Sequence, residues 1–171
     1  LPNVVRAEGR VQSWLVGPGW GPRPDGAREL DDRLASGLPV VVDADALPYV
    51  PEHLGRADVL LTPHAGELAH LLGVSRAEVV DEPVAAVRKA AGQYGVTVLL
   101  KGAVQYVAGP RSTTVQVAVP GPAWTAQAGS GDVLAGICAT LLASGMPAWQ
   151  AAVCAASAQA LTATANPGPY P

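Results

Sequence analysis

Short apolar runs alternate with amphipathic stretches along most of this chain. Apolar runs predict buried strands at 11–16, 40–42, 58–61 and 96–100. Helical periodicity fills the stretches 27–36, 66–72 and 83–94, and a glycine follows each of them, as expected where a helix ends. This alternation is typical of an α/β protein whose mainly parallel sheet is covered by helices on both faces.

The last third of the chain has a different pattern. Strands at 105–107 and 113–119 are predicted to form a hairpin around Gly109-Pro110. Helices at about 132–144 and 147–164 follow, and no charged side chain occurs after Asp132. Gly145-Met146-Pro147 divides this apolar region, so we expect buried helices with no membrane contact. The chain is therefore interpreted as a single domain over 1–171.

Composition narrows the class of protein. Of 171 residues, 49% are hydrophobic and 15% charged, which is typical of a globular domain. The net charge is -3 without a basic run, so nucleic acid is not an expected partner. Cys138 and Cys154 lie in the apolar last third, outside any Cys-x-x-Cys motif or Cys/His cluster. We expect two buried structural thiols, no directly bound metal and a reducing, cytoplasmic location.

Chemically distinctive residues follow directly after the predicted strands. They are the glycine turn 17–21, Asp43 and Asp45, His64, and Lys101. Ligands of open α/β sheets bind at the carboxyl ends of the strands, so these positions predict a site. Asp43 and Asp45 fit equally well as simple turn formers.

A glycine run precedes the first of the two C-terminal helices. Gly129-Ser130-Gly131 lets backbone amides approach an anion closely at a helix N-terminus. The spacing is not that of a P-loop. Asp132 has two readings: it caps the helix, or it accepts a proton from a substrate hydroxyl while the neighbouring amides hold a migrating phosphoryl group.

Five segments occur in an order and spacing that resemble one family. They read VGPGWG at 16–21, VVDADAL at 41–47, LLTPHAGELAHLLG at 60–73, LLKGAVQYV at 99–107 and AGSGDVLAG at 128–136. The last segment resembles the Gly-x-Gly-Asp signature of ribokinase-like small-molecule kinases. Together they resemble the ADP- or ATP-dependent NAD(P)H-hydrate dehydratases. The resemblance implies a three-layer αβα ribokinase-like (Rossmann-like) sandwich, and a family domain that begins before Leu1, so that this chain is N-terminally truncated.

The resemblance also implies a reaction. Hydrated NADH or NADPH (NADHX, NADPHX) carries a hydroxyl on C6 of the nicotinamide ring. The family phosphorylates this hydroxyl from ADP or ATP, and phosphate then leaves as the double bond is restored. Such a donor normally arrives with Mg²⁺. A homo-oligomer and a fused or separate NAD(P)H-hydrate epimerase are further implied partners.

Residue roles follow from the matching motifs. Asp132 matches the catalytic base of the family, and the resemblance implies that Asp132, Gly21 and His64 bind substrate. The amides of Gly129, Ser130 and Gly131 would form the anion hole. Nucleotide binding is implied for Lys101, Gly102, Ala103, Val104, Gln105 and Gly131.

At two positions the sequence differs from the residue that the family usually has, and two acidic residues are candidates for holding Mg²⁺-bound water. Gln105 stands where the family usually has Thr, and Trp20 stands where Leu is common. Glu67 resembles the Glu of the ribokinase Asn-x-x-Glu motif, which organises Mg²⁺-bound water. Asp45 is the other candidate for that role. Glu67 fits somewhat better as an ordinary acid in the first turn of a helix.

Alternative functions remain open at this point. A ribokinase-like kinase of hydroxyethylthiazole or pyridoxal would share the Gly-x-Gly-Asp end but release a stable phosphate ester. His64 within Thr-Pro-His-x-Gly-Glu favours the dehydratase. A nucleotide-binding module that has lost turnover is the other alternative, to which Gln105 gives some weight.

Overall fold

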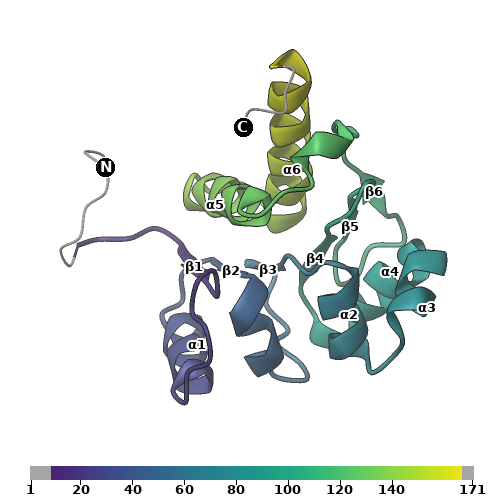
Figure 1. The fold of residues 1–171 in the computed structure, drawn as a ribbon. Coiled ribbons are helices and arrows are strands. Elements are labelled where there is room, and N and C mark those ends of the chain that lie inside the picture. The colour runs from purple at the N-terminus through teal and green to yellow at the C-terminus, as the bar shows by residue number, and fades with distance from the viewer. Residues whose placement is uncertain (1–8, 167–171) are drawn as a thin grey trace.

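The computed structural model describes residues 9–166 and shows a six-stranded sheet between two helical layers (Figure 1). The strands are β1 (Trp14–Val16), β2 (Val40–Val42), β3 (Val59–Leu61), β4 (Thr97–Leu100), β5 (Tyr106–Ala108) and β6 (Gln116–Val117). Their order in the sheet equals their order in the chain. Strands β1 to β4 are parallel, and β5 and β6 extend the sheet as antiparallel strands. The predicted mainly parallel αβα sandwich is confirmed.

Connections between the parallel strands all lie on one face of the sheet (Figure 1). They contain α1 (Gly26–Ala35), η1 (Ala44–Tyr49), α2 (Ala65–Leu72), α3 (Arg76–Asp81) and α4 (Pro83–Tyr94). Each crossover joins neighbouring strands in the same direction, and crossovers have a fixed right hand. The opposite face is therefore free for α5 (Ser130–Ala143) and α6 (Ala148–Ala165).

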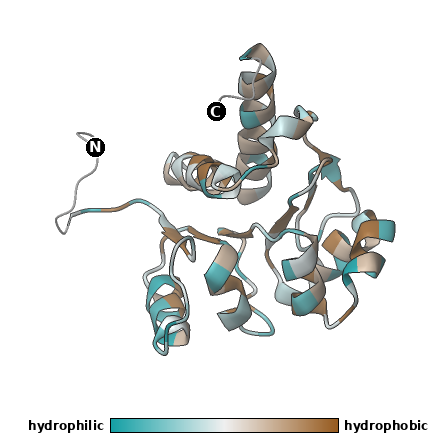
Figure 2. Ribbon diagram, in the orientation of Figure 1, coloured by the Kyte–Doolittle hydropathy of each residue, from teal (hydrophilic) through white to brown (hydrophobic). Residues whose placement is uncertain are grey.

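Alternating side chains of the short strands build one core on each face. Val40 and Val42 belong to the cluster under α1, α2 and α4, whereas Val41 points to the α5–α6 side with Leu60 and Leu99. All five are fully buried. Figure 2 shows these strands as a hydrophobic layer between the helices. Both faces are covered, which explains why the strands read as continuous apolar runs.

Three short elements were not predicted, and β1 is shorter than predicted. Helix α3 begins after Ser75, and η1 and η2 (Ala123–Thr125) are 3-10 helices of two turns and one turn. Pairing of β1 with β2 starts at Trp14, and Val11 is 39% exposed. The predicted strand 11–16 is therefore correct only in its second half.

The C-terminal helices carry both thiols, and one expectation about them is wrong. Cys138 is fully buried on α5, but Cys154 is exposed because α6 turns its alanines, not this side chain, toward the sheet. Burial raises the pKa of the Cys138 thiol to about 12. Across residues 9–166, none of the helices has the length and apolar character needed to cross a membrane.

Candidate active site

Backbone hydrogen bonds align the residues that follow the parallel strands. The Asp43 amide donates to the carbonyl of Val16 at 3.0 Å, and the Lys101 amide donates to the carbonyl of Pro63 at 2.8 Å. His64 and Lys101 form an isolated parallel bridge beyond β3 and β4. Asp43, His64 and Lys101 consequently lie along one edge of the sheet, as the strand pattern predicts.

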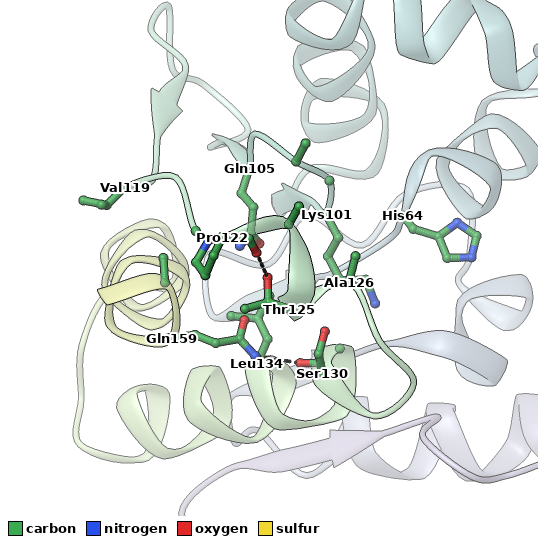
Figure 3. A pocket seen from close by; sticks show the side chains of 16 residues that line it. His64, Lys101, Gln105, Val119, Pro122, Thr125, Ala126, Ser130, Leu134 and Gln159 are labelled. Carbon is green, nitrogen blue, oxygen red and sulfur yellow. Dashed lines mark hydrogen bonds between the residues drawn. The ribbon is translucent and has the colours of Figure 1, made fainter. Parts of the chain in front are cut away.

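A cavity of about 530 Å³ opens at this edge (Figure 3). Ligand sites for small molecules commonly have this size. It is lined by His64, Lys101, Gly102, Ala103, Gln105, Val119, Gly121, Pro122, Ala123, Thr125, Ala126, Ser130, Gly131, Leu134, Gln159 and Ala160. In Figure 3, His64 lies at one end of the cavity, and Val119 and α6 lie at the other.

The N-terminus of α5 forms one wall of the cavity. The helix begins at Ser130, two residues earlier than predicted, behind Gly129 with φ +87°. The Ser130 amide donates to the carbonyl of Gln127 at 3.2 Å, and no described residue accepts from the amides of Gly131 and Asp132. The amides of Gly131 and Asp132 are therefore free donors at this helix end, and Gly131 is also a member of the predicted anion hole.

Lys101 brings a positive charge to the same helix end. Its ammonium lies 2.5 Å from Oδ1 of Asp43, whose side chain is buried. A methyl group added at Gly131 would lie 3.4 Å from Nζ of Lys101. The ammonium and the free amides thus face the same small region. Burial is the largest cause of the raised pKa of Cys138. The Asp43 carboxylate raises this pKa further, and the Lys101 ammonium lowers it.

His64 and Glu67 form a capping box at the start of α2. Nδ1 of His64 accepts from the amides of Gly66 at 3.0 Å and Glu67 at 3.1 Å, and Oε2 of Glu67 accepts from the His64 amide at 2.7 Å. Because Nδ1 is an acceptor, a neutral ring carries its proton on Nε2. This nitrogen lies 3.5 Å from Oε1 of Glu67, so the exposed His64 ring and Glu67 are paired, and Glu67 has a structural role.

Other predicted residues lie outside this cavity. The Gly21 amide donates to Oδ2 of Asp45 at 2.8 Å, which fixes the glycine turn. The side chain of Asp132 is exposed at the start of α5, and Val104 is exposed as well. The neighbouring Gly129 lines a second cavity of about 590 Å³ between α5 and α6. The roles assigned to these residues stay predictions.

Two segments of the cavity wall were missed at the sequence level. One is the loop 119–126, and the other is the stretch of α6 that carries Gln159 and Ala160. Nε2 of Gln159 donates to the carbonyl of Ser130 at 2.8 Å, which ties α6 to the start of α5. The Pro- and Gly-rich sequence VPGP at 119–122 was a signal for a fixed loop, but α6 offered none.

Comparison with protein families matches residues 2–168 to NAD(P)H-hydrate dehydratase. The chain is 48% identical over 151 residues to the bifunctional NAD(P)H-hydrate repair enzyme Nnr of Mycobacterium tuberculosis, covering 85% of this chain and 31% of that protein. It is 42% identical over 151 residues to the ADP-dependent (S)-NAD(P)H-hydrate dehydratase of Neisseria meningitidis, covering 83% and 51%. The chain thus spans about a third to a half of the length of these relatives.

Solved structures show the same fold. The ADP/ATP-dependent NAD(P)H-hydrate dehydratase of Bacillus subtilis, co-crystallized with ATP/Mg²⁺ and soaked with CoA, superposes with a TM-score of 0.79 at 24% identity, covering 90% of this chain and 57% of that one. Hydroxyethylthiazole kinase of Pyrococcus horikoshii gives 0.63 at 19% identity, covering 82% and 58%. The family match covers nearly all of the sequence, and it agrees with the five motifs and the ribokinase-like fold. The chain belongs to the NAD(P)H-hydrate dehydratase family.

Proposed function

We propose that the protein restores NADH and NADPH from their hydrates by an ADP- or ATP-dependent dehydration. The observation that carries the proposal is the cavity at the carboxyl edge, where the Lys101 ammonium and the free amides of α5 meet. A helix N-terminus together with a cation is a natural phosphate site. The family membership of the chain supplies the substrate class.

The nucleotide would lie along the length of the cavity. Its phosphates would meet the amides of Gly131 and Asp132 and the ammonium of Lys101. Its nucleoside would extend along the apolar wall that the loop 119–126 and Ala160 form together. Figure 3 shows Gln105 and Gln159 reaching toward this space from different elements.

The hydrated cofactor would bind on the outer side of the α5 N-terminus, where Asp132 is exposed. Asp132 would accept the proton of the C6 hydroxyl while the oxygen of that hydroxyl attacks the terminal phosphoryl group of the nucleotide. AMP would leave if ADP is the donor, and ADP would leave if ATP is the donor. The C6–O bond then breaks, phosphate departs, and loss of a proton from C5 restores the double bond. His64, through Nε2–H, and Gly21 would hold the substrate. Phosphorylation helps because phosphate is a far better leaving group than hydroxide.

Mg²⁺ would enter with the nucleotide phosphates and supply charge neutralisation. Residues 9–166 contain no cluster of three or more His, Cys, Asp or Glu side chains that could hold a metal ion by itself. Asp45 and Glu67 each use one carboxylate oxygen for a backbone amide. The second oxygen of Glu67 lies 3.5 Å from Nε2 of His64, so Asp45 has the carboxylate that better fits a metal-bound water.

Partners of the whole protein are part of this proposal. We expect a homo-oligomer and cooperation with an NAD(P)H-hydrate epimerase, either fused or separate, in the cytoplasm. The relative from Mycobacterium tuberculosis is named as bifunctional, which supports a second activity in the same polypeptide.

Recovery of reduced-nicotinamide absorbance from NADHX, with ADP or ATP and Mg²⁺, tests the function in the full polypeptide. Asp132→Asn should lower turnover by about 10²- to 10⁴-fold and leave nucleotide binding intact. Asp58→Asn, at the opposite end of the strands, should change neither. Unchanged turnover in Asp132→Asn would refute the assigned base. Phosphorylation of hydroxyethylthiazole or pyridoxal without dehydration would instead identify a vitamin-precursor kinase, and nucleotide binding without turnover an inactive module.

A further inference from the structure

Asp43 is a fully buried carboxylate for which the site described so far has no use. Its side chain is 1% exposed, and that of its partner Lys101 is 16% exposed. The Arg–carboxylate pairs of the described residues are far more open, with side chains between 24% and 40% exposed. The Asp43–Lys101 pair thus joins a buried carboxylate to a partly buried ammonium at the edge of the sheet that carries the cavity.

Stability does not explain why this pair is present. Desolvation of two charges usually cancels their mutual attraction, and apolar residues of similar volume are often as stable or more stable. Here the cost is higher still, because Oδ2 of Asp43 is buried and no described residue donates to it. A buried polar atom without a partner is rare in a native structure, and a functional role is one explanation for it.

Asp43 decides where the ammonium of Lys101 lies. Lys101 follows β4 and Asp43 follows β2, so the lysine side chain crosses the end of β3 to reach its partner. A lysine at a sheet edge otherwise extends into water and samples many rotamers. The carboxylate instead holds Nζ near Gly131, and in Figure 3 this nitrogen lies on the side of the cavity that faces His64.

We propose that Asp43 is a positioning residue, which fixes the Lys101 ammonium at the N-terminus of α5 so that one phosphate group meets the ammonium and the free amides together. The inference rests on the proposed nucleotide function and extends it to a residue without an assigned role. Donors that are already in place bind charge without the cost of ordering them when the ligand arrives.

Nitrogen NMR of the lysine ammonium groups tests the pair directly, since Lys89 and Lys101 are the lysines of this chain. Lys89 is exposed on α4 and serves as an internal reference. We expect protons on the Lys101 ammonium to exchange with water at least tenfold more slowly than those on Lys89. Asp43→Asn should remove this protection, and Asp58→Asn, which alters the Arg56 pair, should not. Equal exchange at both lysines, or protection that survives Asp43→Asn, would overturn the proposal.

Binding of ADP and of adenosine then separates positioning from a purely structural role. Lys101→Met and Asp43→Asn should each lower the affinity for ADP by about tenfold, which is the scale of one charge-assisted hydrogen bond. Neither variant should change the affinity for adenosine. The double variant should be no weaker than either single one, because both remove the same contact. An equal loss of affinity for ADP and for adenosine would show that Asp43 has only a structural role. Tighter binding of ADP by Asp43→Asn would show that Asp43 does not position the ammonium for phosphate. Failure of the wild-type full polypeptide to bind ADP would defeat the proposed function as well.

Discussion

Replacing Gly131 by alanine separates the stability of α5 from its capacity to bind phosphate. Gly131 is the second residue of the helix, so alanine there should stabilise the fold by lowering the entropy lost on folding. The new methyl group would lie 3.4 Å from Nζ of Lys101, which is ordinary van der Waals contact. It would, however, occupy the space in front of the free amides.

The expected magnitudes have opposite signs. Glycine to alanine in a helix contributes about 0.5–1 kcal/mol, which raises Tm by roughly 1–4 °C in a domain of this size. A displaced phosphate loses at least one charge-assisted hydrogen bond, or about 1.5–3 kcal/mol, equivalent to a tenfold or greater loss of ADP affinity. Gly136→Ala is the matched control, because a methyl group there meets no atom within 4 Å.

Thermal unfolding and ADP titration of the two variants provide the measurement. Both should melt at or above the wild-type temperature, and only Gly131→Ala should lose ADP binding. Retention of wild-type ADP affinity by Gly131→Ala would show that phosphate does not approach this helix end. A lower Tm for Gly131→Ala alone would show that its surroundings are tighter than described.

Three further predictions concern the hydrophobic core, the loss of stability at acid pH and the two thiols. Leu60→Ala should destabilise the fold by about 2–5 kcal/mol in urea unfolding, because Leu60 is fully buried under α5 and α6; a loss below 1 kcal/mol would contradict this packing. The Ser75 amide donates to Glu78 and holds the pKa of that carboxyl below its usual 4.5, so its stabilising effect is complete above pH 4.5 and is lost as the pH falls through the lowered value. Glu78→Gln should therefore flatten the stability–pH curve on the acid side, and an unchanged curve would count against the capping box. A disulfide reagent at pH 8 should modify Cys154 in the native protein and Cys138 only after unfolding, and native labelling of both thiols would disprove the burial of Cys138.

Elements whose signal is local were predictable from the sequence. Helix α4 matches its predicted range because Pro83 opens it and Gly95 closes it in the left-handed conformation. Strands β2 and β3 follow from apolar runs that end at polar residues. Helix α3 was missed although Ser75 and Glu78 have the spacing of a capping box, since its six residues are too short to show periodicity.

Features that depend on distant parts of the chain were not predictable. The contact between Lys101 and Asp43 joins residues that only the strand order brings together. Asp45 was expected near Mg²⁺-bound water, and the structure gives it a hydrogen bond to the Gly21 amide 24 residues earlier. Cys154 was expected inside because α6 is apolar all round, and without a polar stripe the sequence does not show which side faces the sheet.

The alanines of α6 have a consequence for how this site can change over time. Seven of them are buried, among them Ala156, Ala160 and Ala163. A methyl group added to Gly121 would meet Cβ of Ala160 at 3.2 Å, so the cavity wall touches this helix almost without free space. Any larger side chain on the inner side of α6 would lift the helix and widen the cavity, at a cost of about 1–3 kcal/mol for overpacking. Substitutions in the loop 119–126 can therefore change which ligand fits at a smaller cost in stability than substitutions on the inner side of α6, which acts as a spacer of fixed thickness.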